Sequence, residues 1–177
     1  MIEGSVALPP STGTRRPVPR WAVGVAHAVP LLVLPSSLWR IGLAVGLPLG
    51  YTEQGLRDLV GTTMWGPLYL AALSLLTEVA ALLTLGLVRP WGEVVPRWIP
   101  LLGGRMIPRP AVTVPAWLGV AVLALLWTPF LFWWTLPHVD MTAAGRLLVG
   151  FVYLPLVAWA PLLAAVTLSY QRRRSIP

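Results

Sequence analysis

The chain has no cysteine and no lysine, and little charge of either sign. Without cysteine it can form no disulfide, carry out no thiol redox chemistry and hold no cysteine-ligated metal. Only 11% of its 177 residues are charged, whereas an ordinary soluble domain has about 25%. Hydrophobic residues make up 56% of the chain and the mean hydropathy is +0.75. This composition excludes a water-facing surface of normal size and indicates an integral membrane protein.

Four long apolar runs fill most of the chain. A helix needs about 20 residues to cross a bilayer core about 30 Å thick. The runs cover residues 21–39 (and, after Arg40, on to Gly50), 59–88, 110–139 and 147–171. We therefore predict an all-α protein, a four-helix transmembrane bundle over residues 21–171, with helices at about 21–46, 65–88, 111–135 and 147–170. A β-barrel is disfavoured because its strands alternate apolar and polar positions, which residues 116–127 do not.

Two short tails flank this domain. Residues 1–20 are rich in Pro, Ser, Thr and Gly, which favours a disordered cytoplasmic tail. Residues 172–177 are expected to form a basic cytoplasmic tail. The first apolar run also resembles a signal peptide, but it exceeds the usual apolar region of about 7–15 residues. No clear small-residue cleavage site follows before Arg40, so we favour a retained helix.

The basic residues, all arginine, predict the orientation. If the chain starts inside, the outer side holds Arg40, Arg57 and Arg146, and the inner side holds Arg15, Arg16, Arg20, Arg89, Arg97, Arg105, Arg109, Arg172, Arg173 and Arg174. The positive-inside rule then places both termini in the cytoplasm. The absence of lysine and the bias to Ala, Leu, Val, Pro and Gly are typical of a GC-rich genome, so we expect a bacterial cell membrane.

The net charge of +7 has a membrane explanation. In a soluble protein it would indicate nucleic acid, but here the arginines flank apolar runs. Anionic lipid headgroups are therefore the expected partner, and nucleic acid is not. A homo-oligomer or a partner membrane protein stays open.

The segment from 89 to 110 is the most distinctive connection. Its five prolines forbid a long helix, and its tryptophans and arginines indicate a loop lying in the inner interface between the second and third helices. We predict that Arg89, Arg97, Arg105 and Arg109 bind anionic headgroups. The simpler alternative is a topological anchor without a specific ligand.

Three short motifs stand in this loop: Trp91-Gly92, Pro96-Arg97-Trp98 and Gly104-Arg105. In these motifs, set between the second and third apolar runs, the chain resembles the uncharacterised multi-pass integral membrane proteins of actinobacteria. The resemblance covers most of the chain past Trp21. It implies no activity and assigns a role to no residue.

One acidic residue lies inside an apolar run. Glu78 is the only charged residue among the thirty positions from 59 to 88. With Ser74, Thr77 and Thr84 it follows the spacing of one helix face, so this polar stripe should face the bundle interior. A buried ionised carboxylate costs several kcal/mol unless it is paired.

Several groups are candidate partners for Glu78. An ion pair with Arg40 requires offset helices, and if the first helix ends near Arg40, that side chain snorkels to the outer interface instead. His27 lies about one helical turn from the level of Glu78, so a hydrogen bond between them would satisfy both. Tyr153 and Thr167 of the last helix are further candidates.

The predicted outer connections carry weaker signals. Thr52 is placed to cap a short helix with Glu53 in its first turn. His138 and Asp140 are too few for a metal site, which needs three or four ligands, so we expect no metal and no cofactor.

Neither a repeat nor a dimer motif is clear in the sequence. The two helical pairs share no readable pattern, so we predict no internal repeat. Gly42, Gly46 and Gly50 would form a smooth contact stripe on a continuous helix, although Pro48 interrupts it.

Three functions stay open at this stage. The favoured one is a non-enzymatic envelope or accessory membrane component. The second is a proton-coupled small-molecule carrier that uses Glu78. The third is an intramembrane enzyme acting on a lipid or isoprenoid, with Glu78 as the candidate catalytic acid. The sequence shows no nucleophile–base pair, metal cluster or Gly-rich phosphate loop, which weighs against an enzyme.

Overall fold

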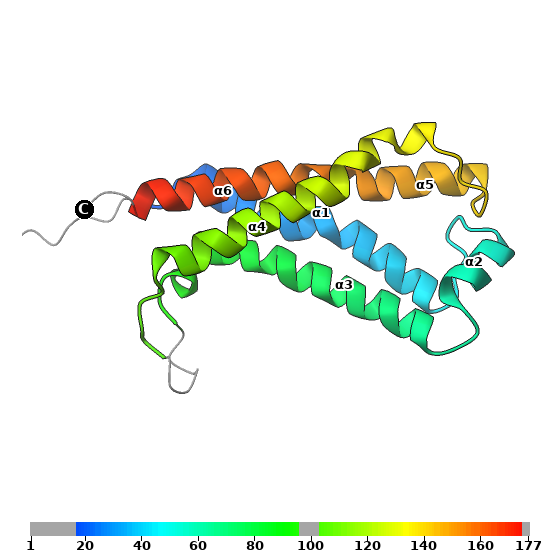
Figure 1. Ribbon diagram of the computed structural model, residues 1–177, viewed down its shortest axis with the longest axis horizontal. Helices are drawn as coiled ribbons and strands as arrows, with labels where there is room; N and C mark the ends of the chain where they lie inside the picture. The colour runs from blue at the N-terminus through cyan, green and yellow to red at the C-terminus, as the bar shows by residue number, and fades with distance from the viewer. Residues whose placement is uncertain (1–16, 96–102, 175–177) are drawn as a thin grey trace, which may run out of the picture.

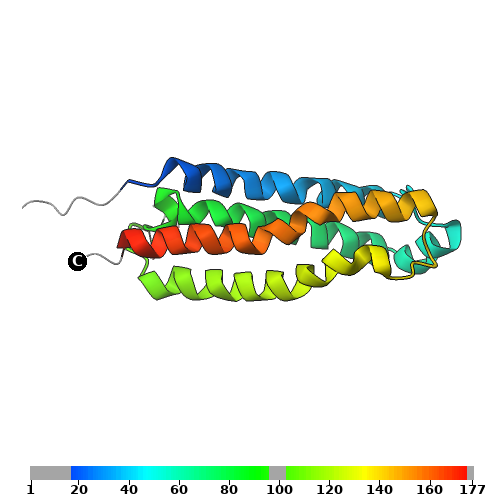
Figure 2. The same cartoon turned by 90° about the horizontal axis from the view of Figure 1, so that it is seen from above.

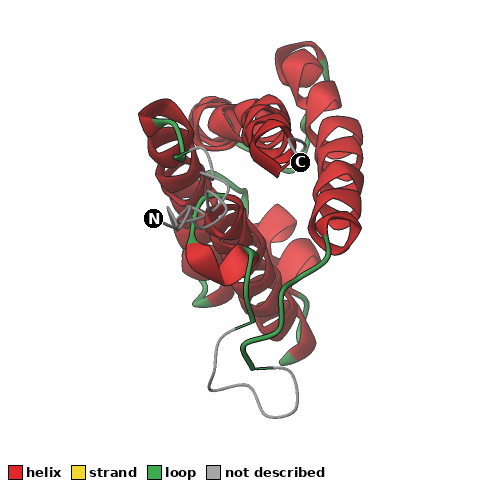
Figure 3. Ribbon diagram, turned by 90° about the vertical axis from the view of Figure 1, so that its left-hand side faces the viewer, coloured by secondary structure: helices red, strands yellow, loops and turns green. Residues whose placement is uncertain are grey.

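A computed structural model describes residues 17–95 and 103–174 and shows a bundle of long helices (Figure 1). The elements in chain order are α1 (Arg20–Ala44), α2 (Glu53–Val60), α3 (Trp65–Leu83), η1 (Thr84–Leu87), η2 (Pro90–Gly92), α4 (Arg109–Trp127), η3 (Thr128–Thr135), α5 (Ala143–Tyr153), η4 (Leu154–Ala158) and α6 (Trp159–Arg174). The η elements are 3₁₀ helices. Figure 3 shows the same bundle end-on.

Four continuous helical segments are long and apolar enough to cross a membrane. They are Arg20–Ala44, Trp65–Leu87, Arg109–Thr135 and Ala143–Arg174. The predicted all-α four-helix bundle is therefore confirmed. The last helix runs on through Arg174, so Arg172–Arg174 are helical rather than part of a tail. Residues 1–16, most of the predicted disordered tail, lie outside the described residues, as do 96–102 and 175–177.

Prolines mark two places where α-helix changes to 3₁₀ helix. Pro129 opens η3 and Pro155 opens η4. Proline has no N–H to donate to the carbonyl four residues earlier, and the tighter 3₁₀ turn takes over at both positions. The third and fourth spans are therefore composite helices, whereas α1 continues as α-helix through Pro30 and Pro35.

The helices pack in the order α3, α1, α6, α4. α1 packs along α3 and against α6, and α6 packs along α4, while α3 and α4 scarcely touch. Figure 2 shows α1 and α4 on opposite edges of the bundle. The open side between α3 and α4 is the feature of the fold that matters for the site.

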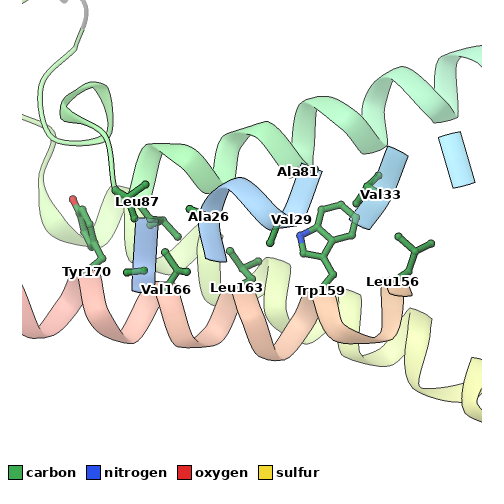
Figure 4. Close-up of a cluster of buried hydrophobic side chains, with 12 residues drawn as sticks. Ala26, Val29, Val33, Ala81, Leu87, Leu156, Trp159, Leu163, Val166 and Tyr170 are labelled. Carbon is green, nitrogen blue, oxygen red and sulfur yellow. The ribbon is translucent and has the colours of Figure 1, made fainter. Parts of the chain in front are cut away.

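The main core lies between α1 and α6. Its α1 face is built from small and β-branched residues, Ala22, Ala26, Val29 and Val33, all fully buried. Such small side chains let neighbouring helices approach closely in a membrane. The face opposite them carries the larger residues Leu156, Trp159, Leu163, Val166 and Tyr170 (Figure 4).

The end of the bundle that carries α2 is closed by two matching turns. Thr52 caps α2 by accepting a bond from Gly55 N at 3.0 Å, which confirms the predicted cap, and Thr142 caps α5 from Gly145 N at the same distance. Thr52 N donates to Asp140 O and Thr142 N donates to Gly50 O, each at 2.9 Å. The two turns thus bond to each other reciprocally.

This reciprocity reveals a local repeat. Both turns read Thr-x-x-Gly, at 52–55 and at 142–145, and each follows the first long helix of a helical pair. A Cβ on Gly145 would overlap the carbonyl of Gly50, and one on Gly55 would overlap the carbonyl of Asp140. The prediction that the two pairs share no pattern was wrong for this segment, because a four-residue match is too short to be recognised without its contacts.

The predicted glycine stripe does not form. α1 ends at Ala44, and Gly46 and Gly50 adopt φ values of +90° and +101° in the turn that follows. These left-handed conformations suit glycine and end the helix before the stripe is complete.

We expect Gly145→Ala to destabilise the protein by about 1–3 kcal/mol, since the added methyl group overpacks the contact with Gly50. Thermal unfolding in detergent micelles measures this. Gly24→Ala is the matched control, because a Cβ at Gly24 meets no atom within 4 Å. Equal melting temperatures for the two variants would contradict the proposed close packing.

Candidate functional site

A buried arginine connects three helices. Arg40, on α1, is only 4% exposed. Its Nε donates to Ser74 Oγ of α3 at 3.2 Å, its Nη1 to Tyr153 OH of α5 at 3.3 Å, and its Nη2 to Ser37 Oγ at 3.2 Å. Arg40 therefore lies within the first span, one turn before its end, and it does not snorkel.

The environment of this guanidinium is aromatic and uncharged. The Arg40 Cζ lies 5.8 Å from the centre of the Tyr153 ring, within range of a cation–π interaction. Trp39, Trp127 and Phe130 surround the same ring at centroid distances of 5.4 to 5.8 Å. Among the described residues no carboxylate pairs with Arg40. Within the described chain, three hydroxyl groups and the Tyr153 ring face compensate its charge, which makes the cluster a clamp between helices.

Glu78 has none of its expected partners. Its Oε1 is buried and accepts no hydrogen bond within the described chain. His27 instead contacts Val23 O through Nδ1 at 2.7 Å and Arg89 Nη2 through Nε2 at 3.1 Å. Thr167 donates to Leu163 O. Neither candidate pairing of Glu78, with Arg40 or with His27, forms, because each of those groups finds a nearer partner at its own level of the bundle.

The residues of the predicted polar stripe differ in how deeply they are buried. Ser74 and Thr84 are buried, whereas Thr77 and Glu78 are half-buried. Thr77 bonds within its own helix, to Leu73 O at 2.6 Å. Of these four side chains, all within the described residues, Ser74 alone hydrogen-bonds to another helix: its Oγ accepts from Arg40 Nε at 3.2 Å and donates to Ser37 O at 3.4 Å, both on α1.

An apolar groove of about 720 Å³ separates α3 from α4. Its walls come from α3 with η1, from the loop at both sides of the 96–102 gap, and from α4, while α6 forms part of its lining. The lining residues are Ala80, Leu83, Thr84, Gly86, Leu87, Trp91, Gly92, Val95, Ile107, Ala111, Val112, Pro115, Ala116, Gly119, Val122, Leu123, Trp159 and Leu163. None of them is charged.

Glu78 does not belong to this groove. At 3.6 residues per turn, Ala80 and Leu83, the groove residues on α3, lie roughly 140–160° around the helix from Glu78. The carboxyl group and the groove are therefore on opposite faces of α3. A carboxylic acid acting on a molecule in the groove would have to reach around its own helix.

The end of α6 fixes the loop that closes the groove. Tyr170 OH donates to Gly92 O at 3.3 Å, Arg173 Nη2 to Leu87 O at 2.7 Å, and Arg174 Nη1 to Ile107 O at 3.3 Å. Arg173 also forms an ion pair with Glu93 at 3.9 Å. Sequence reasoning missed this role, although three arginines directly after an apolar run, in the last turn of a helix, were the available signal.

The arginines that we predict to bind headgroups have different surroundings in the structure. Arg89 contacts His27, Arg105 and Arg109 are exposed, and Arg97 lies outside the described residues. Arg109 lines a second cavity, of about 260 Å³, whose other lining residues are Thr113, Tyr170, Gln171 and Arg174.

The described residues offer no metal site. No group of three or more His, Asp or Glu side chains comes together in residues 17–95 and 103–174. The His138 ring lies against Trp133, with ring centres 3.7 Å apart and ring planes tilted by 42°.

No family model, curated protein or solved structure matches this chain. Its four apolar helices are those of a multi-pass membrane protein.

We expect Tyr153→Phe to lower stability by about 1 kcal/mol, since it removes one acceptor of the buried Arg40. Tyr69→Phe, on the exposed surface of α3, is the matched control and should change little. Unfolding in mixed micelles with increasing dodecyl sulfate compares the two variants. A larger loss in Tyr69→Phe would rule out the clamp.

Proposed function

We propose that this chain is a non-enzymatic component of a bacterial cell membrane that holds an apolar chain from the bilayer, such as a lipid acyl chain, in the groove between α3 and α4. The observation that carries the proposal is the uncharged groove of about 720 Å³, a volume typical of small-molecule sites. Its lining offers packing surface and no catalytic group, which favours binding over chemistry.

The groove lies where a close helix contact is missing. The first helix of the first pair, α1, packs on the second helix of the other pair, α6. The corresponding contact, between α4 and α3, is replaced by the groove. Small residues on its walls, among them Ala80, Ala116 and Gly119, keep it wide. Since lipid tails are as apolar as the walls, selectivity would come from shape and packing.

We expect Ala80→Leu to reduce occupancy of the groove by about 10-fold, because the added side chain fills space that the acyl chain needs. Ala72→Leu, on an exposed position of α3 that does not line the groove, is the control. Lipid retained on the purified protein, counted by native mass spectrometry, measures occupancy. A second pair, Gly119→Leu against Ala121→Leu, tests the α4 wall in the same way. Equal lipid retention within both pairs would reject the proposal.

One observation favours a second candidate, the proton-coupled carrier. The Glu78 carboxyl group, inside the second span, has a buried oxygen without a hydrogen-bond partner among the described residues. Glu78 lines neither cavity, however, so the lipid-modifying enzyme gains no support.

Glu78→Gln separates the two candidates, because it keeps the shape and removes the titration. We expect this variant to retain lipid like the parent protein. Uptake of small apolar and cationic compounds into reconstituted vesicles, with and without a pH gradient, tests the carrier. Gradient-driven uptake that is lost in Glu78→Gln would favour the carrier over the binding protein.

We place both termini in the cytoplasm. The start of α1 and the end of α6 lie at the same end of the bundle (Figure 2), and seven of the ten arginines that the structure describes belong to that side. We expect a reporter that works only in the cytoplasm to be active when it is fused to either end of the chain. A periplasmic signal from either fusion would reverse the assignment.

A further inference from the structure

The second cavity lies where the first turns of α4 meet the last turns of α6. Arg109 and Thr113 come from α4, and Tyr170, Gln171 and Arg174 from α6. Both helix segments end their membrane spans here, at Arg109 and at Arg174. The cavity is therefore at the boundary between the apolar bundle and the headgroup layer.

Two guanidinium groups line this cavity and no carboxylate does. The Arg109 side chain is exposed and forms no hydrogen bond or ion pair with the described part of the chain. Arg174 is held by Nη1, which bonds to Ile107 O and to Tyr170 OH, so its Nε and Nη2 have no hydrogen-bond acceptor among the described residues. The acidic residue of the neighbouring loop, Glu93, forms its ion pair with Arg173, which does not line this cavity.

Like charges that share a small cavity repel each other. An anion between the two arginines removes this repulsion and accepts charge-assisted hydrogen bonds from both. The Tyr170 ring lies 5.5 Å from the Arg174 Cζ and helps to fix that guanidinium in place. The site is thus partly assembled before a ligand arrives.

We propose that this cavity binds the phosphate of an anionic phospholipid that has no amine in its headgroup. Arg109 and Arg174 bind the phosphate oxygens, and the acyl chains lie along the apolar outer surface of α4. An ammonium group, as in phosphatidylcholine or phosphatidylethanolamine, would be repelled by the same two charges. The site is separate from the groove between α3 and α4, so it goes beyond the proposed function.

The test is a titration of the full-length protein in a mild detergent with dioleoyl phosphatidylglycerol and dioleoyl phosphatidylcholine, followed by native mass spectrometry. We expect phosphatidylglycerol to bind about 10-fold more tightly than phosphatidylcholine. Arg109→Gln and Arg174→Gln should each weaken phosphatidylglycerol binding by about 10-fold and leave phosphatidylcholine unchanged. Arg172→Gln is the matched control, since it removes the same charge from an exposed neighbouring position that does not line the cavity.

Equal affinity for the two lipids would overturn the proposal. So would a loss of phosphatidylglycerol affinity in Arg172→Gln equal to that in Arg109→Gln, because it would indicate only diffuse attraction to positive charge. Binding of glycerol 3-phosphate as tight as that of the lipid would assign the site to a soluble phosphate. The Arg109 side chain forms no hydrogen bond with the described residues, so its variant remains informative even if Arg174→Gln disturbs the fold. Ala80→Leu tests the groove and does not touch the second cavity. A failure of headgroup selectivity can therefore be distinguished from a failure of the proposed function.

Discussion

A buried positive charge without a carboxylate partner organises this bundle. In a membrane interior a guanidinium must be satisfied by the protein itself, and Arg40 achieves this with three hydroxyl groups from α1, α3 and α5. Each bond has a short reach, so the three helices must lie close to Arg40 at one level. This requirement places α1 between its hairpin partner and the last span, in contact with both.

The position of α4 follows from the same arrangement. α4 contributes no bond to the Arg40 cluster and contains no buried residue. It packs on α6 and leaves α3 uncovered on that side. The groove is therefore a consequence of three helices being fixed together while the fourth is attached to only one of them. Its apolar lining suits a chain from the bilayer, which is why binding is the function that we propose.

The two ends of the bundle are closed by different chemistry. At the α2 end, backbone bonds and two Thr-x-x-Gly turns join the helical pairs through glycines that allow close contact. At the other end, arginine and tyrosine side chains of α6 hold the carbonyls of a proline-rich loop. A loop that cannot form a helix leaves its carbonyls free, and long cationic side chains are able to reach them. The same concentration of arginines leaves two guanidinium groups in one cavity without an acidic partner among the residues that the structure describes.

The sequence alone determined the all-α class, the four spans and the Thr52 cap, because these depend on local composition: long apolar runs exclude water, and a threonine before a helix bonds its own first turn. It also drew attention to Glu78, Ser74, Tyr153 and Arg109. Only the tertiary structure decided what those side chains contact. Partners such as Arg40 and Tyr153 are 113 residues apart, and the rotation and offset of each helix, which no local pattern encodes, determine whether they meet. The same geometry turned Glu78 away from the groove and brought Arg174 beside Arg109, because packing between helices fixes which face of each helix looks inward.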